Sequence, residues 1–438
     1  MIRRTTNILK DHLRSNKAAQ TVVTKVKKPS PKLTASDVSD ARKYIDNFWV
    51  NLERYQPKDE ESLIGLPNKY LVPAHDPKSS FNFDEMYYWD SYFMVQGMLG
   101  DCENKTFVIG ILENLFTLLQ RFKTIPNASR TYLTGRSQPP LLTSFIFDVY
   151  DAYGLDKRWL EQAISYAKIE YETVWMGERK PFWHNVHKGL SRYYDINSLH
   201  DLAEAESGWD MTPRFNRKCM DYLPVDLNAF LYKYEADFAR AANLLARPDE
   251  QLAWEEKAAS RKNTMQDLMW NKTEKLYFDY NYVLQKRGRV ASLASYVPLW
   301  AGMVDETQAK QLTKSLRRFI APGGLLTTDQ PPIKTAIPQK TPTQWAAPNG
   351  WAPLQFLTVQ GLEKYGYYDE ASRVVQRWLK TNLNWYNRNG VFLEKYNVLN
   401  PAKSPLEGVY PSQTGFGWTN AIFERFCQDY IDKTSPDD

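Results

Sequence analysis

The sequence has few cysteines and no long apolar run, and each absence excludes a class of protein. Only 3 cysteines occur among 438 residues, at Cys102, Cys219 and Cys427. This excludes a disulfide framework and also a zinc site, which needs closely spaced ligand pairs. We expect the three to be buried, reduced thiols. No segment approaches the roughly 20 apolar residues of a membrane span, and no apolar stretch follows the basic N-terminus as in a secretory signal. The sequence therefore predicts a cytoplasmic protein without a membrane partner.

Motifs for metals, nucleotides and activated nucleophiles are also lacking. The chain has no Gly-rich phosphate loop and no G-x-S-x-G turn, which excludes the usual nucleotide sites and serine hydrolases. His184 and His187 lie close together without an H-E-x-x-H motif around them, so we expect them to be surface or loop residues. The sequence predicts no metal site.

Positive charge is concentrated at the N-terminus. The net charge is +5, and between Arg3 and Lys32 Asp11 is the one acidic residue. The remainder is close to neutral, which argues against a basic face for nucleic acid. We expect residues 1–34 to form a basic, disordered tail and residues 435–438 to form a short C-terminal tail.

Helical periodicity dominates the rest of the chain. Apolar residues recur with helical spacing in 107–119 and 227–245, a pattern typical of amphipathic helices packed against one another. Strand-like alternation is rare, and 276–282 is the best candidate. No linker rich in Pro, Gly or Ser divides residues 35–434, so we predict a single all-α domain. Further helices are expected at about 140–153, 157–176, 249–269, 306–318, 352–365, 368–383 and 416–431.

Long loops that hold most of the tryptophans separate these helices. Structureless connections beyond about 12–15 residues are uncommon and usually functional. The chain contains 14 Trp, 27 Tyr and 20 Phe, which fits either a well-packed core or a cleft in which sugar faces stack on rings. Many helices with functional loops on one face would suit a toroid of paired helices. The loops are expected at 62–90, 124–140, 177–224, 321–351 and 384–415.

Acidic residues recur within these aromatic loops. They occur in the three segments FDEMYYWDSY (83–92), AESGWD (205–210) and FLEKY (392–396). A carboxyl group beside a tryptophan loses solvation in its charged form, which raises its pKa. Glycoside hydrolysis needs two carboxyl groups with different surroundings. Each acid taken singly also fits a loop cap or a salt bridge, so composition does not identify the pair.

Polar side chains in another loop are suited to hydroxyl recognition. The segment PNASRTYLTGRSQPP (126–140) carries Arg130, Arg136 and Gln138, which offer several N–H donors. The alternative is that the two arginines pair with acids of neighbouring loops.

Six ordered motifs resemble those of the trehalases, the glycoside hydrolases that split the α,α-1,1 bond of trehalose. The resemblance runs from about residue 83 to residue 420, nearly the whole predicted domain. It implies an (α/α)6 barrel with long functional loops on one face, an inverting mechanism, and neither a metal nor an organic cofactor. The motifs are YYWDSYF (87–93), PNASRTYLTGRSQPP (126–140), ESGWD (206–210), PNGWAPLQ (348–355), EKY (394–396) and GFGWTN (415–420).

The resemblance also implies roles for individual residues. Asp210 corresponds to the general acid and Glu394 to the general base of the family. We expect a small disaccharide as substrate and a monomer that needs no partner protein. The implied sugar-binding residues are Phe83, Trp89, Asp90, Asn127, Arg136, Ser137, Gln138 and Gly208, with Trp345 and Trp351 stacking nearby.

The chain departs from the family pattern at several recognition positions. Asn82 replaces an arginine, and Ala346 replaces a carboxylate. Val409 replaces a glutamate that contacts sugar, and Glu407 is expected to substitute for it. Two alternatives therefore remain beside trehalose hydrolysis: the same mechanism acting on another small α-glucoside, and a non-catalytic sugar-binding relative.

Overall fold

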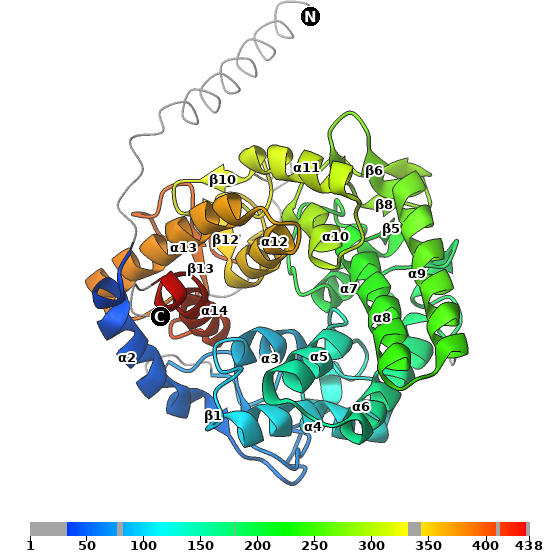
Figure 1. Ribbon diagram of the computed structural model, residues 1–438, viewed down its shortest axis with the longest axis horizontal. Helices are drawn as coiled ribbons and strands as arrows, with labels where there is room; N and C mark the ends of the chain where they lie inside the picture. Colours follow the sequence, from blue (N-terminus) through cyan, green and yellow to red (C-terminus); the bar gives the residue numbers. More distant parts are fainter. Residues whose placement is uncertain (1–32, 77–81, 179, 332–342, 409–411, 435–438) are drawn as a thin grey trace, which may run out of the picture.

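A set of helices is buried over most of its surface and forms a ring (Figure 1). Every residue of α3 is buried, because this helix is apolar on nearly all sides and is stable only when surrounded by protein. Tyr92 of α3 packs edge-on against Phe145 of α5. Each later helix of the set contacts the next, and α14 contacts α3. The set comprises α3 (Tyr88–Val95), α5 (Leu142–Tyr153), α8 (Val225–Leu244), α10 (Val297–Trp300), α12 (Ala352–Lys364) and α14 (Gly417–Tyr430).

A second set of helices lies outside the first and buries one face of each helix (Figure 1). In α13 the buried Ala371, Val374, Val375 and Trp378 recur at helical spacing, which produces one apolar stripe. This helix ends at Gly390, whose φ of +71° suits a glycine C-cap. The outer set comprises α2 (Ala35–Leu52), α4 (Lys105–Phe122), α6 (Lys157–Glu170), α9 (Pro248–Met269), α11 (Glu306–Ser315) and α13 (Tyr368–Asn389).

The strands are short antiparallel pairs within the connections between helices. β12 (Asn349–Trp351) pairs with β13 (Lys395–Asn397) and places Trp351 opposite Lys395. The remaining pairs are β1 (Glu53–Arg54) with β2 (Tyr70–Leu71), β3 (Asn185–His187) with β4 (Leu190–Ser191), β6 (Trp270–Asn271) with β7 (Leu276–Tyr277), β10 (Ile320–Ala321) with β11 (Gly324–Leu325), and β8 (Tyr280–Asn281) with both β5 (Tyr222–Leu223) and β9 (Lys286–Arg287).

Short helical segments complete the connections. α7 (His200–Glu206) lies within one of the predicted long loops. Single helical turns occur at Thr131–Leu133, Cys219–Asp221, Leu293–Tyr296, Leu316–Arg318 and Asp432–Thr434, and a π-helical turn at Tyr171–Trp175.

This computed structural model describes residues 33–76, 82–178, 180–331, 343–408 and 412–434. The predicted tails lie outside these ranges except for residues 33 and 34, and so does Val409. Within the ranges, no helix is long and apolar enough to cross a bilayer.

The mainly helical character predicted from periodicity is confirmed, with corrections at particular segments. The predicted strand over 276–282 is two strands, β7 and β8, interrupted at Phe278 and Asp279. The loop predicted from residue 384 begins too early, because α13 continues to Asn389. Cys219 and Cys427 are buried, but Cys102 is exposed.

Candidate active site

A cavity of about 310 Å³ lies where three buried helices begin. Asp90 belongs to the first turn of α3, Trp351 precedes α12, and Phe416 precedes α14. Helix N-termini carry free N–H groups and a positive end of the dipole, which suit oxygen-rich ligands. The predicted residues that line this cavity are Phe83, Trp89, Asp90, Asn127, Arg136, Gln138, Gly208, Asp210, Trp345, Trp351 and Glu394.

Asp210 reaches the cavity from the segment after α7. Gly208 has a φ of +72°, a conformation that favours glycine. An added Cβ on Gly208 would lie 3.5 Å from the indole of Trp89, so the chain passes close to that ring. Burial raises the pKa of Asp210 to about 7, although a hydrogen bond with the backbone lowers this pKa in part. The nearby charge of Glu394 raises it further. A carboxyl group with this pKa holds a proton near neutral pH.

Glu394 immediately precedes β13, and its backbone is held on both sides. Its N–H donates to Gln413 O at 3.0 Å, and its carbonyl accepts from Trp418 Nε1 at 3.0 Å. The hydroxyl of Thr419 donates to the same carbonyl at 3.4 Å. The Glu394 carboxylate forms an ion pair of 2.6 Å with Lys395 Nζ, and both side chains are almost fully buried.

A third carboxyl group belongs to the same electrostatic cluster. Burial raises the pKa of Asp90 well above its usual range, and the charges of Glu394 and Asp210 add to the effect. Acidic groups that share one buried site cannot all ionise at moderate cost. Asp90 therefore favours the protonated form, which can donate a hydrogen bond as well as accept one.

Tryptophans form one wall of the cavity. The rings of Trp345 and Trp351 are parallel, with centroids 3.8 Å apart and planes at 3°. Trp418 meets both edge-on, at 6.2 Å and 6.0 Å. Phe416 packs against Trp418 at 4.4 Å. These rings give the cavity an apolar aromatic lining, which is typical of sites that bind sugars.

The polar loop 126–138 folds back on itself and contributes Asn127, Arg136 and Gln138 to the cavity lining. Asn127 donates through Nδ2 to Ser137 O at 3.1 Å, and its N–H donates to Arg136 O at 2.9 Å. Gln138 Oε1 accepts from the N–H of Trp89 at 2.7 Å, so this side chain satisfies a free donor in the first turn of α3. Asn127 and Gln138 thus serve loop geometry as well as lining the cavity.

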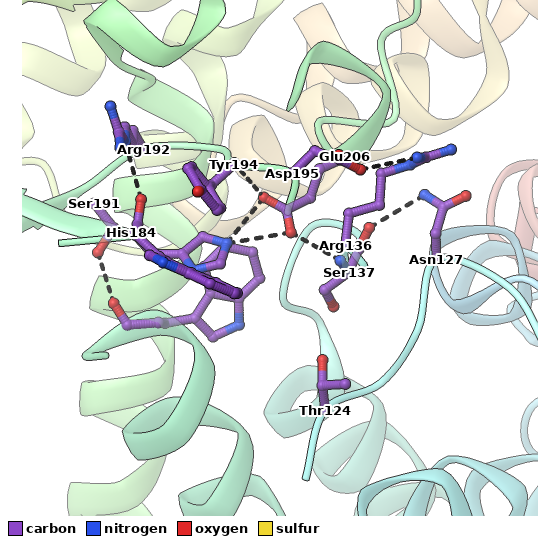
Figure 2. Close-up of polar contacts among 12 residues, drawn as sticks. Thr124, Asn127, Arg136, Ser137, His184, Ser191, Arg192, Tyr194, Asp195 and Glu206 are labelled. Carbon is purple, nitrogen blue, oxygen red and sulfur yellow. Dashed lines mark hydrogen bonds and ion pairs between the residues drawn. The ribbon is translucent and has the colours of Figure 1, made fainter. Parts of the chain in front are cut away.

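Glu206 ties this loop to two other segments (Figure 2). Its buried carboxylate accepts from Ser137 N at 2.8 Å and from Tyr194 N at 2.7 Å. His184 Nε2 lies 3.1 Å from the same carboxylate. Arg136 forms an ion pair of 3.0 Å with buried Asp195. These contacts fix the loop against the segment that leads to Asp210.

Two predicted sugar-binding residues are not among the residues that line the cavity. The hydroxyl of Ser137 donates to Ile125 O at 2.7 Å, and Glu407 is exposed. We expected His184 to lie at the surface or in a loop, and its side chain is buried. Of the substituted positions, Asn82 accepts from Asp76 N at 3.0 Å, and Ala346 is buried.

Sequence reasoning missed several residues that line the cavity. Glu85 contributes a further buried carboxylate, which pairs with Arg130 at 3.1 Å and accepts from the hydroxyl of Tyr87 at 2.9 Å. Tyr132 and Trp418 also line the cavity. Their aromatic character and their place within the recognised motifs were signals available in the sequence.

Several donors on cavity-lining residues are buried and unused by the described protein. Trp89 Nε1, Trp351 Nε1 and Arg136 Nε have no hydrogen-bond partner among the described residues. A buried donor left without a partner costs about 1–3 kcal/mol, so hydroxyl groups of a ligand would relieve this cost. Among the described residues, no group of three or more His, Cys, Asp and Glu side chains could hold a metal ion.

A ring of buried helices with several carboxyl groups and indoles around one cavity defines a glycoside hydrolase. The trehalase family model matches residues 3–199 and 178–430. The chain belongs to the trehalase family and is therefore a trehalase-type glycoside hydrolase.

Solved structures agree with this assignment. The neutral trehalase of Saccharomyces cerevisiae is 27% identical, with a TM-score of 0.70 over 89% of this chain and 79% of that chain. A mannosylglycerate hydrolase from Thermus thermophilus, solved with glucose, is 18% identical, with a TM-score of 0.65 over 88% of this chain and 99% of that chain. The second similarity is one of fold alone.

Proposed function

We propose that this chain hydrolyses the α,α-1,1 bond of trehalose to two glucose molecules with inversion at the anomeric carbon. The observation that carries the proposal is the shared cavity of Asp210 and Glu394, two carboxyl groups with unlike surroundings. Burial raises the pKa of Asp210, whereas the Glu394 carboxylate forms an ion pair of 2.6 Å with Lys395. Unlike surroundings separate the roles of acid and base.

Asp210 acts as the general acid in this proposal. Its pKa of about 7 leaves a substantial protonated fraction near neutral pH. The proton passes to the bridging oxygen as the bond from that oxygen to the anomeric carbon breaks, and the departing glucose leaves as a neutral alcohol.

Glu394 acts as the general base. The ammonium group of Lys395, 2.6 Å away, accompanies the negative charge that a base must carry. The carboxylate takes a proton from water as the water oxygen bonds to the anomeric carbon on the face opposite the leaving group. An inverting enzyme needs room for this water, with the two carboxyl groups about 6.5–9.5 Å apart.

Recognition of the two sugar rings is assigned to the tryptophan wall and the polar loop. Trp345 and Trp351 contribute apolar aromatic lining, and Arg136, Trp89 and Asp90 offer hydrogen-bonding groups to hydroxyls. All these groups come from one chain, so the proposed site needs no second copy to complete it.

We also propose that the two helix sets form an (α/α)6 barrel, within one catalytic domain over residues 35–434. The contacts of each buried helix with the next, and of α14 with α3, support this architecture. So does the pairing of α8 with α9 and of α12 with α13, in which a buried helix is followed by an outer one.

The stereochemistry of the first products tests the mechanism. NMR of freshly cleaved trehalose should show one α-glucose and one β-glucose before mutarotation. Two α-glucoses would contradict inversion. Binding of trehalose without glucose release over hours would instead favour the non-catalytic alternative.

Another small α-glucoside remains the second candidate substrate. It is favoured by Asn82 and Ala346, which leave two recognition groups of the family without a counterpart. Hydrolysis rates across a panel of α-glucosides separate the candidates. A strong preference for trehalose would dismiss this alternative.

A further inference from the structure

Five buried side chains, three indoles with a cation at each end, form a continuous stack near the proposed catalytic groups. Trp345 lies between Trp209, at 5.5 Å and 22°, and Trp351, at 3.8 Å and 3°. The guanidinium of Arg214 lies 4.4 Å from the ring of Trp209. The ammonium of Lys395 lies 5.0 Å from the ring of Trp351. We call this set the tryptophan column.

Two members of the tryptophan column, Trp209 and Lys395, are each the chain neighbour of one proposed catalytic residue. Trp209 immediately precedes Asp210, and Lys395 immediately follows Glu394. Consecutive Cα atoms are about 3.8 Å apart, so Asp210 stays close to Trp209 and Glu394 stays close to Lys395. The distance spanned by the stacked rings therefore bears on the distance between Asp210 and Glu394.

Backbone contacts attach the middle of the column to the same segments. The N–H of Trp345 donates to Met211 O at 3.0 Å, and Gln344 Nε2 donates to Asp210 O at 2.7 Å. Trp351 is paired with Lys395 across β12 and β13. The column is thus linked to the Asp210 segment on one side and to the Glu394 strand on the other.

The outer end of the column is anchored by charge. Arg214 is buried and lies 2.7 Å from both Asp226 Oδ1 and Asp279 Oδ1. Asp226 belongs to α8, while Asp279 follows β7. A guanidinium held by two carboxylates has little freedom to move, and rings packed at interior density resist compression.

We propose that the tryptophan column is a spacer that sets the separation of the Asp210 and Glu394 carboxyl groups, with Trp209 as a positioning residue. This inference rests on the proposed function, because it assigns a mechanical purpose to the two proposed catalytic groups. Displacement of reacting groups by about 1 Å can cost about 10²-fold in rate. Trp209 suits a test because it is not among the residues that line the cavity.

Trp209→Met tests the spacer, since methionine fills space without a flat ring. We expect kcat for trehalose to fall about 30–100-fold with KM changed less than about threefold. Trp209→Phe keeps a ring and should retain kcat within about fivefold. Trp254→Met is the matched control, because Trp254 is a buried indole that packs against Phe238 outside the column. This control should lose thermal stability but keep kcat within about twofold.

A double variant separates positioning from general destabilisation. If Trp209 acts through the geometry of the two acids, Trp209→Met should cost little further activity once Glu394→Gln has removed the base. Equal kcat losses in Trp209→Met and Trp254→Met, or a raised KM with unchanged kcat, would overturn the spacer. Should Trp209→Met fail to fold, the comparison of Trp209→Leu with Trp254→Leu carries the same two outcomes, because leucine also removes the flat ring.

Failure of the proposed function is recognised separately. A wild-type protein that releases no glucose from trehalose contradicts that function but leaves the spacer testable by crystallography. The carboxyl separation should change by about 1 Å or more in Trp209→Met and stay unchanged in Trp254→Met. An unchanged separation in both variants would overturn the spacer.

Discussion

Lys395 forms a buried ion pair of 2.6 Å with its chain neighbour Glu394 and also lies over the ring of Trp351 at 5.0 Å. The ammonium group therefore contacts both a carboxylate and an aromatic face. Cation–π contacts strengthen when water is excluded, and an ion pair left with one partner in a buried site is costly. Lys395 thus couples the charge of the proposed base to the packing of the tryptophan wall.

Asp210→Asn should abolish nearly all turnover while the protein remains folded. Asparagine has almost the same shape but no acidic proton, and general acid catalysis contributes about 10²–10⁴-fold. We expect kcat for trehalose to fall by at least that factor with an unchanged circular dichroism spectrum. A variant that retains more than a tenth of wild-type kcat would contradict the assignment.

The pH profile should report the protonation of Asp210. Because burial raises the pKa of this carboxyl to about 7 and the acid works in its protonated form, kcat/KM should fall as pH rises through about 7. The expected slope is tenfold per pH unit on that limb. Steady-state assays from pH 5 to 9 measure it, and an activity that keeps rising above pH 8 would exclude Asp210 as the acid.

Glu206→Gln should weaken both stability and catalysis. The carboxylate accepts from Ser137 N and Tyr194 N and contacts His184, whereas an amide has one accepting oxygen. An unsatisfied buried donor costs about 1–3 kcal/mol of unfolding free energy, and a displaced loop should also lower kcat/KM. Denaturant unfolding and trehalose assays measure the two effects.

Glu161→Gln is the control for this variant. Glu161 is exposed and pairs with Arg247 at the surface, so its substitution should change stability by no more than about 0.5 kcal/mol. Equal effects of the two substitutions would remove the special role of Glu206.

Because of the buried carboxyl group of Glu170, the free energy of unfolding should fall as pH rises from about 4.5 to 7. Burial raises the pKa of its carboxyl to about 7 in the folded protein, against 4.5 for the ordinary group. The folded state therefore binds the proton more tightly over this interval, so unfolding free energy falls as pH rises and levels off above about pH 7. At about 1.4 kcal/mol per pH unit, the loss is at most about 3.5 kcal/mol.

Glu170→Gln should remove this part of the pH dependence. Glu204, with a pKa raised by burial to about 8, and Asp210 contribute in the same direction, so a smaller decline should persist. Urea unfolding of both proteins at pH 5 and pH 7.5 measures the difference. Parallel declines would show that Glu170 does not titrate in this way.

Features with a local cause could be predicted from the sequence. Helices such as α4 and α13 follow apolar spacing that repeats every three or four residues. A raised pKa was expected for Asp210 because a tryptophan precedes it, and the structure agrees in direction. The extent of α13 was misjudged, since its last turn past 383 is largely polar and its boundary depends on Gly390.

Features that join distant segments could not be predicted in the same way. The pairing of His184 with Glu206 has no signature in the spacing of either residue. The use of Arg214 as the anchor of a stacked column depends on two carboxylates, Asp226 of α8 and Asp279 after β7. Nothing in the local pattern around Arg214 distinguishes it from an exposed arginine.

The amino-acid sequence by itself determined the helical character of this protein and the presence of acids beside aromatic residues, because both depend on neighbours a few positions apart. The tertiary structure decided which acids face one cavity and which indoles stack between them. The physical reason is that the helices form a ring in which α14 contacts α3. This arrangement brings Glu394 and Asp210, which lie in separate connections, to the same cavity.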